Sequence, residues 1–218
     1  MRVATFNVRH CEGLDGAVDV DSIAEMMRAT GAEVIALQEL DRGLPRSGRV
    51  DQAEALREAT GMNVAFAATL HRRLGDYGIG IASAGPLETR FEPLPQAGEE
   101  EPRGVLYGTY AEITVITTHL TRDAAARPLQ LEAVARLARL HAPTVLVMGD
   151  LNVAPRDLGP LNDAPLTRCD GLPTLPARRP RRQIDHILVG PGLEIVKCWT
   201  VPTDASDHRP LVAEIAVD

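Results

Sequence analysis

The stretch TVLVMGDLN, residues 144–152, places an acidic and an amide side chain directly after an apolar run. Residues 144–149 have the length and composition of a buried β-strand, so Asp150 and Asn152 are expected at its carboxyl end. The same arrangement recurs along the chain, with oxygen or imidazole side chains beside apolar runs: Asn7 after VATF, Glu39 after VIALQ, His119 after VITT, Asp185 after QI, and Asp207 with His208 before PLVAEI. One such residue is usually a cap or a turn former. The recurrence of such residues predicts that they share one functional site at the rim of the sheets, because layered α/β folds place their sites where strand ends meet.

Apolar periodicity predicts many short strands and few helices. Strands are expected over residues 2–8, 33–38, 63–68, 78–83, 104–110, 112–118, 144–149, 183–189, 193–201 and 210–216. Helices are expected over residues 21–30, 50–60 and 125–141. Because the helices fall between consecutive strands, the pattern favours a single α+β domain over residues 1–218, with two sheets and outer helices.

Length and composition exclude several classes of protein. The 218 residues suffice for one compact domain, and 44% hydrophobic with 24% charged residues is ordinary globular composition. The apolar runs are strand-length, far short of the roughly 20 residues of a membrane-spanning helix. The net charge is −7 and aromatic residues make up 3% of the chain, so neither a broad basic face for nucleic acid nor base-stacking platforms are expected. A bound divalent cation would still let an acidic pocket receive a phosphate.

The three cysteines, Cys11, Cys169 and Cys198, are odd in number and widely spaced. This pattern suits a reducing compartment better than a disulfide framework, so all three are expected to be structural fillers rather than metal ligands. The first residues, MRVATFNVRH, read as a strand rather than as a basic segment followed by an apolar signal core. A cytoplasmic location is expected on these grounds, unless a leader precedes this sequence.

Two Pro- and Gly-rich stretches, residues 42–48 and 154–182, are predicted to be loops without regular elements. Long loops in compact domains are usually functional or disordered. The second contains RRPRR (178–182), a local basic run in an acidic chain. Two interpretations of this run stay open: a solvated loop, or a contact to a phosphate beside the motif that follows it.

The residue types at the strand ends indicate a hard divalent cation. Carboxylate and amide oxygens with few sulfurs are the ligands that Mg²⁺ or Mn²⁺ prefers. Glu39 is the first candidate ligand, because a carboxylate stays ionised near neutral pH. Hydrolysis of a phosphoester needs such a cation, an activated water in line with the leaving oxygen, and donors to the phosphoryl oxygens.

Six segments resemble motifs of the endonuclease/exonuclease/phosphatase superfamily, also called the DNase I-like fold: TFNVR (5–9), LQE (37–39), TTHL (117–120), GDLN (149–152), QIDHILV (183–189) and SDHRPLVAEI (206–215). They follow the family's order and span nearly the whole chain. The resemblance implies a four-layered α/β/β/α sandwich, in which two packed mixed sheets carry outer helices. It also implies a divalent-metal-dependent phosphoester hydrolase.

The resemblance gives the metal and acid–base residues their roles. The metal ligands would be Glu39, with Asn7 holding the metal or the adjacent phosphate and Asp207 as a further ligand. His208 would be the general base or a group that polarises the phosphate. Asp185 would hydrogen-bond the His208 ring and fix its tautomer.

The other motifs resemble the family's phosphate and water contacts. Asp150 would orient the nucleophilic water, Asn152 would donate to the phosphate, and His119 would lie beside the scissile group. A histidine in TTHL is typical of the DNase I, sphingomyelinase and inositol-phosphatase branches, so repair of abasic sites is disfavoured.

Two further segments resemble family motifs less closely. EPRGVL (101–106) makes Arg103 a candidate phosphate contact, and an exposed loop arginine is the alternative. GDYGIGIAS (75–83) makes Tyr77 a candidate phosphate contact and Asp76 a weak site candidate. The chain is short for the family, which leaves little room for insertions that select a substrate.

The sequence therefore predicts a phosphodiesterase that activates water for in-line attack on phosphorus. Nucleic acid, phospholipid head groups or inositol phosphates, and small soluble phosphodiesters stay open as substrates. The acidic charge disfavours tight nucleic-acid binding, and neither stable membrane association nor an obligate protein partner is expected. The alternatives are a nuclease acting on DNA or RNA and, in a different class, a catalytically silent protein that binds a phospho-ligand or a protein. A silent member would be expected to lack Glu39, Asp150 or His208, and all three are present.

Overall fold

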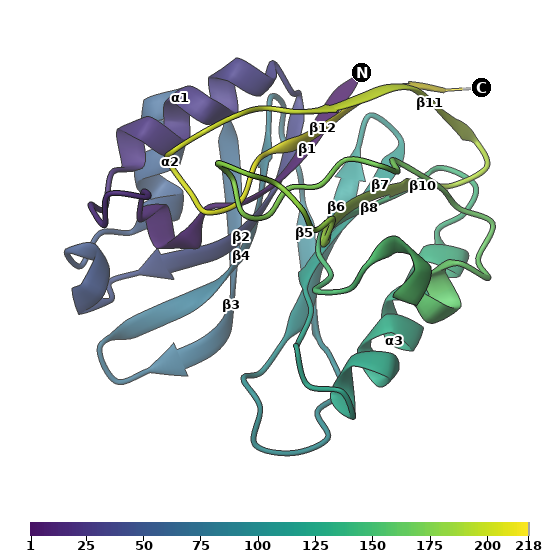
Figure 1. The fold of residues 1–218 in the computed structure, drawn as a ribbon, viewed down its shortest axis with the longest axis horizontal. Coiled ribbons are helices and arrows are strands. Elements are labelled where there is room, and N and C mark those ends of the chain that lie inside the picture. The colour runs from purple at the N-terminus through teal and green to yellow at the C-terminus, as the bar shows by residue number, and fades with distance from the viewer. Residues whose placement is uncertain (218) are drawn as a thin grey trace.

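The computed structural model describes residues 1–217 and contains two mixed sheets of six strands each (Figure 1). The first sheet has the order β11 (Leu193–Thr200), β12 (Leu211–Val217), β1 (Arg2–Asn7), β2 (Val34–Arg42), β4 (Gly75–Ser83), β3 (Asn63–Arg72). The second sheet has the order β5 (Thr89–Pro93), β6 (Gly104–Tyr110), β7 (Ile113–His119), β8 (Val145–Asp150), β10 (Asp185–Val189), β9 (Thr167–Arg168). The β1–β2 and β7–β8 pairs are parallel, and the other pairs within these sheets are antiparallel.

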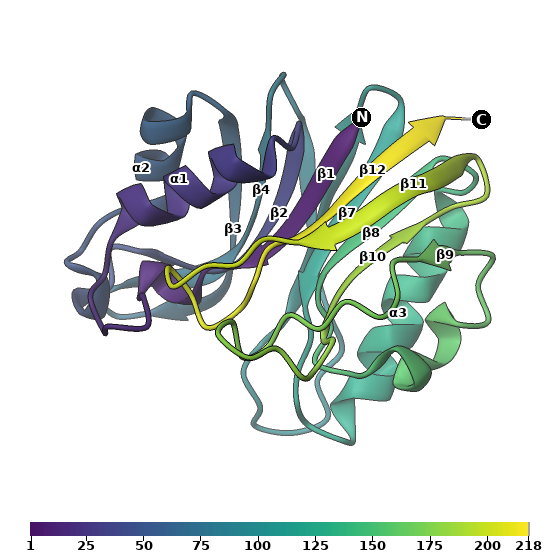
Figure 2. The same ribbon diagram turned by 45° about the horizontal axis from the view of Figure 1, so that its top comes forward.

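Three α-helices cover the outer faces of the two sheets. In Figure 2, α1 (Val20–Thr30) and α2 (Gln52–Thr60) lie on the first sheet, and α3 (Ala126–Leu140) lies on the second. Short 3₁₀ helices lie in the connections: η1 (Arg9–Cys11), η2 (Pro45–Ser47), η3 (Pro155–Asp157) and η4 (Gly159–Leu161). No helix in residues 1–217 is long and apolar enough to cross a membrane. The predicted α/β/β/α sandwich of two mixed sheets with outer helices is confirmed.

The first two α-helices begin and end where their sequence signals lie. Asp19 caps α1 by accepting hydrogen bonds from the backbone N–H groups of Asp21 and Ser22, and Gly31 ends the helix with φ 61°. In α2 the corresponding residues are Asp51 and Gly61. Such caps stabilise short helices by pairing backbone groups that the helix itself leaves free.

Three apolar layers hold the sandwich together. Strand alternation turns Val3 of β1 toward the layer between the sheets and turns Ala4 and Phe6 toward α1 and α2. On the second sheet, Val115 of β7 faces the layer between the sheets, while Ile116 faces α3. Both sheets are therefore buried on their two faces, which explains why the central strands read as nearly continuous apolar runs.

The predicted strands and α-helices are present with shifted ends, and the prediction of two featureless loops is wrong. Residues 42–48 contain η2, and residues 154–182 contain η3, η4 and β9. Strands β5 and β9 were not predicted, because both are short edge strands with polar sequences, TRFEP and TR. Because these two strands are short and carry few apolar side chains, apolar periodicity gives them no signal.

The prediction that all three cysteines stay unpaired is wrong for two of them. Cys169 and Cys198 form a disulfide, while Cys11 is free and buried beneath α1. Cys169 follows β9 at one edge of the second sheet and Cys198 lies in β11 at one edge of the first, so the disulfide joins the two sheets. The cysteine spacing therefore gives no support to a reducing compartment.

Gly149 allows β7 and β8 to approach closely just before Asp150. A Cβ atom at this position would overlap the carbonyl oxygen of Thr118 on the neighbouring strand. Because that oxygen belongs to the backbone, a rotamer change cannot relieve the overlap. Gly149 thus fixes how far Asp150 stands from His119, its partner in the β7–β8 register.

We predict that Gly149→Ala destabilises the protein by about 2 kcal/mol or more, because the strands must separate to admit the methyl group. Urea unfolding followed by circular dichroism measures the change. Gly98→Ala is the matched control, since its Cβ would meet only Glu100 Oε2 at 3.4 Å. Equal stabilities of the two variants would contradict the close approach described above.

Candidate active site

One row of residues runs across three strands of the second sheet. His119 ends β7, Asp150 ends β8 and Asp185 begins β10, and the registers pair His119 with Asp150 and Asp150 with Asp185. Because β8 runs parallel to β7 and antiparallel to β10, two strand ends and one strand start meet at a single edge. His119 Nε2 lies 3.5 Å from Asp150 Oδ2.

The first sheet contributes Asn7 from the end of β1 and Glu39 from within β2. The amide nitrogen of Asn7 donates to Glu39 Oε1 at 2.9 Å and to Asp150 Oδ2 at 3.1 Å, so it links carboxylates from the two sheets. The amide oxygen of Asn7 accepts the backbone N–H of Arg9 at 3.0 Å. Asn7 therefore fixes the spacing of the two carboxylates across the sandwich.

A bulge in β2 directs Glu39 toward the edge where these residues meet. The pairing of β2 with β4 shifts between Gln38 and Leu40, and Glu39 adopts φ 64° in the left-handed region. Asn152 adopts φ 54° on the opposite side of the site. Left-handed backbone costs a glutamate of order 1 kcal/mol or more, so its presence at the rim indicates a functional constraint.

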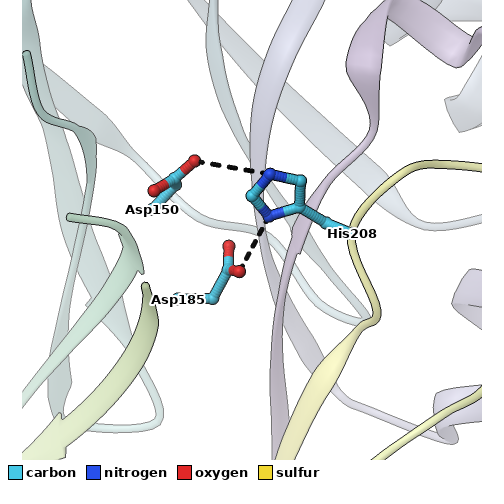
Figure 3. Close-up of side chains that lie close together, drawn as sticks. All are labelled: Asp150, Asp185 and His208. Atoms are coloured by element: carbon cyan, nitrogen blue, oxygen red, sulfur yellow. Dashed lines mark hydrogen bonds and ion pairs between the residues drawn. The ribbon is translucent and has the colours of Figure 1, made fainter. Parts of the chain in front are cut away.

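His208 enters the site from the segment that precedes β12 (Figure 3). Its Nδ1 lies 2.8 Å from Asp185 Oδ2, and its Nε2 points toward Asp150 Oδ2 at 3.8 Å. Thr174 also donates a short hydrogen bond to Asp185 Oδ2. The ring is thus held by Asp185 with its second nitrogen directed at the Asp150 side of the site.

Burial and mutual repulsion perturb the two aspartates. Asp150 and Asp185 are both 0% exposed. Burial, followed by the negative charge of Asp185, raises the pKa of Asp150 from 3.8 to about 7. Hydrogen bonds from Asn7 and from the backbone N–H of Asn152 act in the opposite direction. Asp150 therefore exchanges protons near neutral pH, as a group that accepts a proton from water must.

The pKa values of the two histidines shift in opposite directions, although burial lowers both. Burial alone would lower the pKa of His208, but Asp185, Asp150 and Asp207 outweigh it and raise the pKa from 6.5 to about 10. Burial and then the positive charge of Arg103 lower the pKa of His119 well below 6.5. At neutral pH the site therefore pairs a charged His208 with a neutral His119.

An open hollow of about 490 Å³ adjoins this row of residues. Glu39, His119, Tyr77, Arg103 and Arg122 all line it. The Arg103 side chain is 12% exposed and its buried Nε has no hydrogen-bond partner among the described residues. A larger hollow of about 650 Å³ between β5, β6 and the end of α3 contains none of the predicted site residues that the structure describes.

Three of the predicted site residues differ in how they relate to the row of residues described above. Asn152 borders the site through its backbone, which donates to Asp150 Oδ1 at 3.0 Å, and its amide nitrogen donates to the carbonyl of Leu120. Asp207 is half-buried, and its carboxylate has no hydrogen bond to the other site residues within the described chain. Asp76 forms ion pairs with Arg42 and His71 instead of facing the site.

The donor set fits a hard divalent cation. Asp150 and Asp185 both lie beside the charged His208, and Asn7 links a third carboxylate, that of Glu39, to Asp150. Asp185 Oδ1 is buried without a hydrogen-bond partner in the described residues. One oxygen or nitrogen from each of Asp150, Asp185 and His208 lies within 4.8 Å of the others. Excess negative charge on oxygen ligands is the condition under which Mg²⁺ or Mn²⁺ binds.

Three residues of the site were not predicted from the sequence. Ser206 donates to the backbone carbonyl of Asn7 at 2.7 Å and accepts from the N–H of His208 at 3.2 Å, so it joins β1 to the His208 segment. It belongs to the motif SDHRPLVAEI and could have been found there. Thr174 and Arg122 lie in irregular segments, where no periodicity or motif marks them.

The chain belongs to the endonuclease/exonuclease/phosphatase family, whose model matches residues 4–208. This family consists of phosphoesterases and nucleases that are generally dependent on divalent metals. No curated protein sequence is similar enough to count as a relative. The predicted family resemblance is therefore confirmed.

Several solved structures share the fold. An endonuclease/exonuclease/phosphatase from Beutenbergia cavernae has a TM-score of 0.83 at 22% identity, covering 100% of this chain and 71% of that one. A family protein from Bacteroides thetaiotaomicron has a TM-score of 0.79 at 16% identity, covering 100% and 98%. A 3'-5' exonuclease from Neisseria meningitidis has a TM-score of 0.72 at 20% identity, covering 98% and 99%. These likenesses establish the fold.

We predict that Asp150→Asn changes the pH dependence of stability in metal-free protein. The unfolded carboxyl loses its proton near pH 3.8 and the folded one near 7, so wild-type stability falls as the pH rises through this window. Because an asparagine side chain does not titrate, the Asp150→Asn variant does not lose stability in this way. The stability of the variant relative to wild type should therefore rise by roughly 3 kcal/mol between pH 4 and pH 7.

Urea unfolding in EDTA at several pH values measures this difference. Asp157→Asn is the matched control, because the side chain of Asp157 is 58% exposed and should show no such trend. A difference between Asp150→Asn and wild type that stays constant with pH would contradict the raised pKa.

Proposed function

We propose that this protein is a divalent-metal-dependent phosphodiesterase that activates water for in-line attack on phosphorus. The observation that carries the proposal is the meeting of Glu39, Asp150, Asp185 and His208 at one rim, with Asn7 linking the carboxylates of the two sheets. Membership of a phosphoesterase and nuclease family supports the same reaction class. The proposed substrate binds in the hollow beside Glu39 and His119.

Asp150 is proposed to accept the proton of the attacking water. Its pKa near 7 leaves a useful fraction ionised at neutral pH, and Asn7 and the Asn152 backbone hold both of its oxygens in place. Because the carboxylate is fully buried, its surroundings need little rearrangement when it accepts the proton.

His208 is proposed to act as a charged donor to a phosphoryl oxygen. The raised pKa favours this role over that of a general base, since a base must be unprotonated before the reaction. Asp185 and Thr174 fix the ring so that Nε2 faces the site. The neutral ring of His119, with Arg103, Tyr77 and Asn152, is proposed to complete the phosphate contacts.

Glu39 is proposed to hold Mg²⁺ or Mn²⁺, with Asn7 and Asp207 as the further ligands that the family resemblance implies. When bound, the cation would neutralise charge on the phosphoryl oxygens and favour ionisation of water. Glu39 suits this role because it lines the open hollow, while Asn7 holds one of its carboxylate oxygens.

We predict that Asp150→Asn and His208→Ala each lower kcat at least about 100-fold, because each removes a group that exchanges or donates a proton in the transition state. The assay is hydrolysis of bis-p-nitrophenyl phosphate with Mg²⁺, Mn²⁺ or EDTA. Activity should require the metal. The substrates p-nitrophenyl phosphate and supercoiled plasmid, tested alongside, distinguish a diesterase from a monoesterase and a nuclease.

Asp157→Asn removes the same charge from an exposed position and should retain wild-type turnover. Circular dichroism checks that each variant is folded. Near-wild-type turnover in both Asp150→Asn and His208→Ala would overturn the assigned roles. A wild-type protein that cleaves no substrate in any metal would instead favour the catalytically silent alternative.

A further inference from the structure

A second hollow adjoins the proposed active site at Asn152. It measures about 580 Å³, and Asn152 forms part of its wall. The backbone N–H of Asn152 donates to Asp150 Oδ1, so the wall of this hollow includes a residue bonded directly to the proposed general base. A hollow of this size accommodates a group larger than a single phosphate.

Three arginines line this hollow: Arg156, Arg181 and Arg182. Among the described residues that line it, none is acidic. Arg181 and Arg182 are exposed and form no ion pair within residues 1–217, and Arg156 has only a 3.6 Å contact to its exposed neighbour Asp157. In a chain with net charge −7, three available guanidinium groups beside one another indicate a site for an anion.

The structure divides the basic run 178–182 into residues with different surroundings. Arg178 is paired with Asp204 at 2.9 Å. Arg179 is exposed and does not line the hollow. Arg181 and Arg182 do line it, together with the apolar side chains of Pro155 and Ile184. The basic run is therefore not uniform: its first arginine is paired, and its last two border the hollow.

The arginine segment is fixed to the catalytic residues through its backbone. Leu175 and Arg182 form an antiparallel bridge, and Thr174 at its base donates to Asp185. The N–H of Ala177 donates to the carbonyl of Asp207 at 2.7 Å. These bonds hold the backbone of Arg182 at a constant position relative to Asp185 and His208, as a specificity site requires.

We propose that the hollow lined by Arg156, Arg181 and Arg182 is a second anion-binding subsite, which holds another phosphate of the substrate beside the scissile phosphodiester. This inference rests on the proposed phosphodiesterase function. It narrows the substrate to molecules that carry at least two phosphate groups separated by a small organic spacer. Both a short polynucleotide and a phosphorylated inositol diester have this chemistry.

The test measures binding by calorimetry in EDTA, where the absence of metal prevents hydrolysis. The ligands are the thymidine dinucleotide TpT and its two terminally phosphorylated forms, pTpT and TpTp. Glycerophosphoinositol and its 4-phosphate form the second set. We expect the additional phosphate to tighten binding at least about tenfold in one of these sets, which identifies the spacer.

The preference should disappear in the triple variant Arg156→Gln, Arg181→Gln, Arg182→Gln. Arg179→Gln is the control: it removes one positive charge from the same basic run outside the hollow, and it should keep the preference. Equal affinity for ligands with and without the additional phosphate, binding of none of them, or a preference that survives in the triple variant would each overturn the subsite.

Hydrolysis of bis-p-nitrophenyl phosphate by the wild-type protein with Mg²⁺ or Mn²⁺ separates the two claims. This substrate has one phosphate and needs no second subsite, so its hydrolysis tests the proposed function alone. Hydrolysis without a phosphate preference would overturn the subsite and keep the enzyme. A phosphate preference in EDTA without hydrolysis would keep the subsite and overturn the phosphodiesterase.

Discussion

Two buried carboxylates, Asp150 and Asp185, face each other across adjacent strands at one edge of the second sheet. Their repulsion in a medium of low polarity must be offset by positive charge or by protonation. His208 supplies one charge and holds it between them, while burial and the charge of Asp185 keep the pKa of Asp150 raised. The site is therefore built to receive further positive charge, which the proposed cation provides.

The fold places these charges with little freedom. Gly149 lets β7 and β8 approach, the β2 bulge turns Glu39 inward, and Asn7 links Glu39 to Asp150 across the two sheets. Ser206 joins the His208 segment to the end of β1. Each contact unites segments far apart in the chain, so the site exists only when both sheets have formed and packed.

Much of the fold and the site could be predicted from the sequence, for a physical reason. Central strands are buried on both faces and read as apolar runs, and a polar residue at the end of such a run, as at Asp150 or Glu39, stands out. Edge strands such as β5, the pairing of Cys169 with Cys198, and the hydrogen bond from Thr174 to Asp185 depend on tertiary contacts. Local periodicity contains no information about such contacts. The arginines of the basic run likewise acquire different surroundings only when the segment folds against the rim.

The most direct test of this account is a calorimetric titration of the wild-type protein with Mn²⁺, beside Glu39→Gln and the exposed control Glu25→Gln. The account predicts saturable binding to wild type and to the control, and an affinity at least about tenfold weaker in Glu39→Gln, since one charged oxygen ligand is lost. Absence of binding to the wild-type protein, or equal affinity in all three, would contradict the claim that these carboxylates form a metal site.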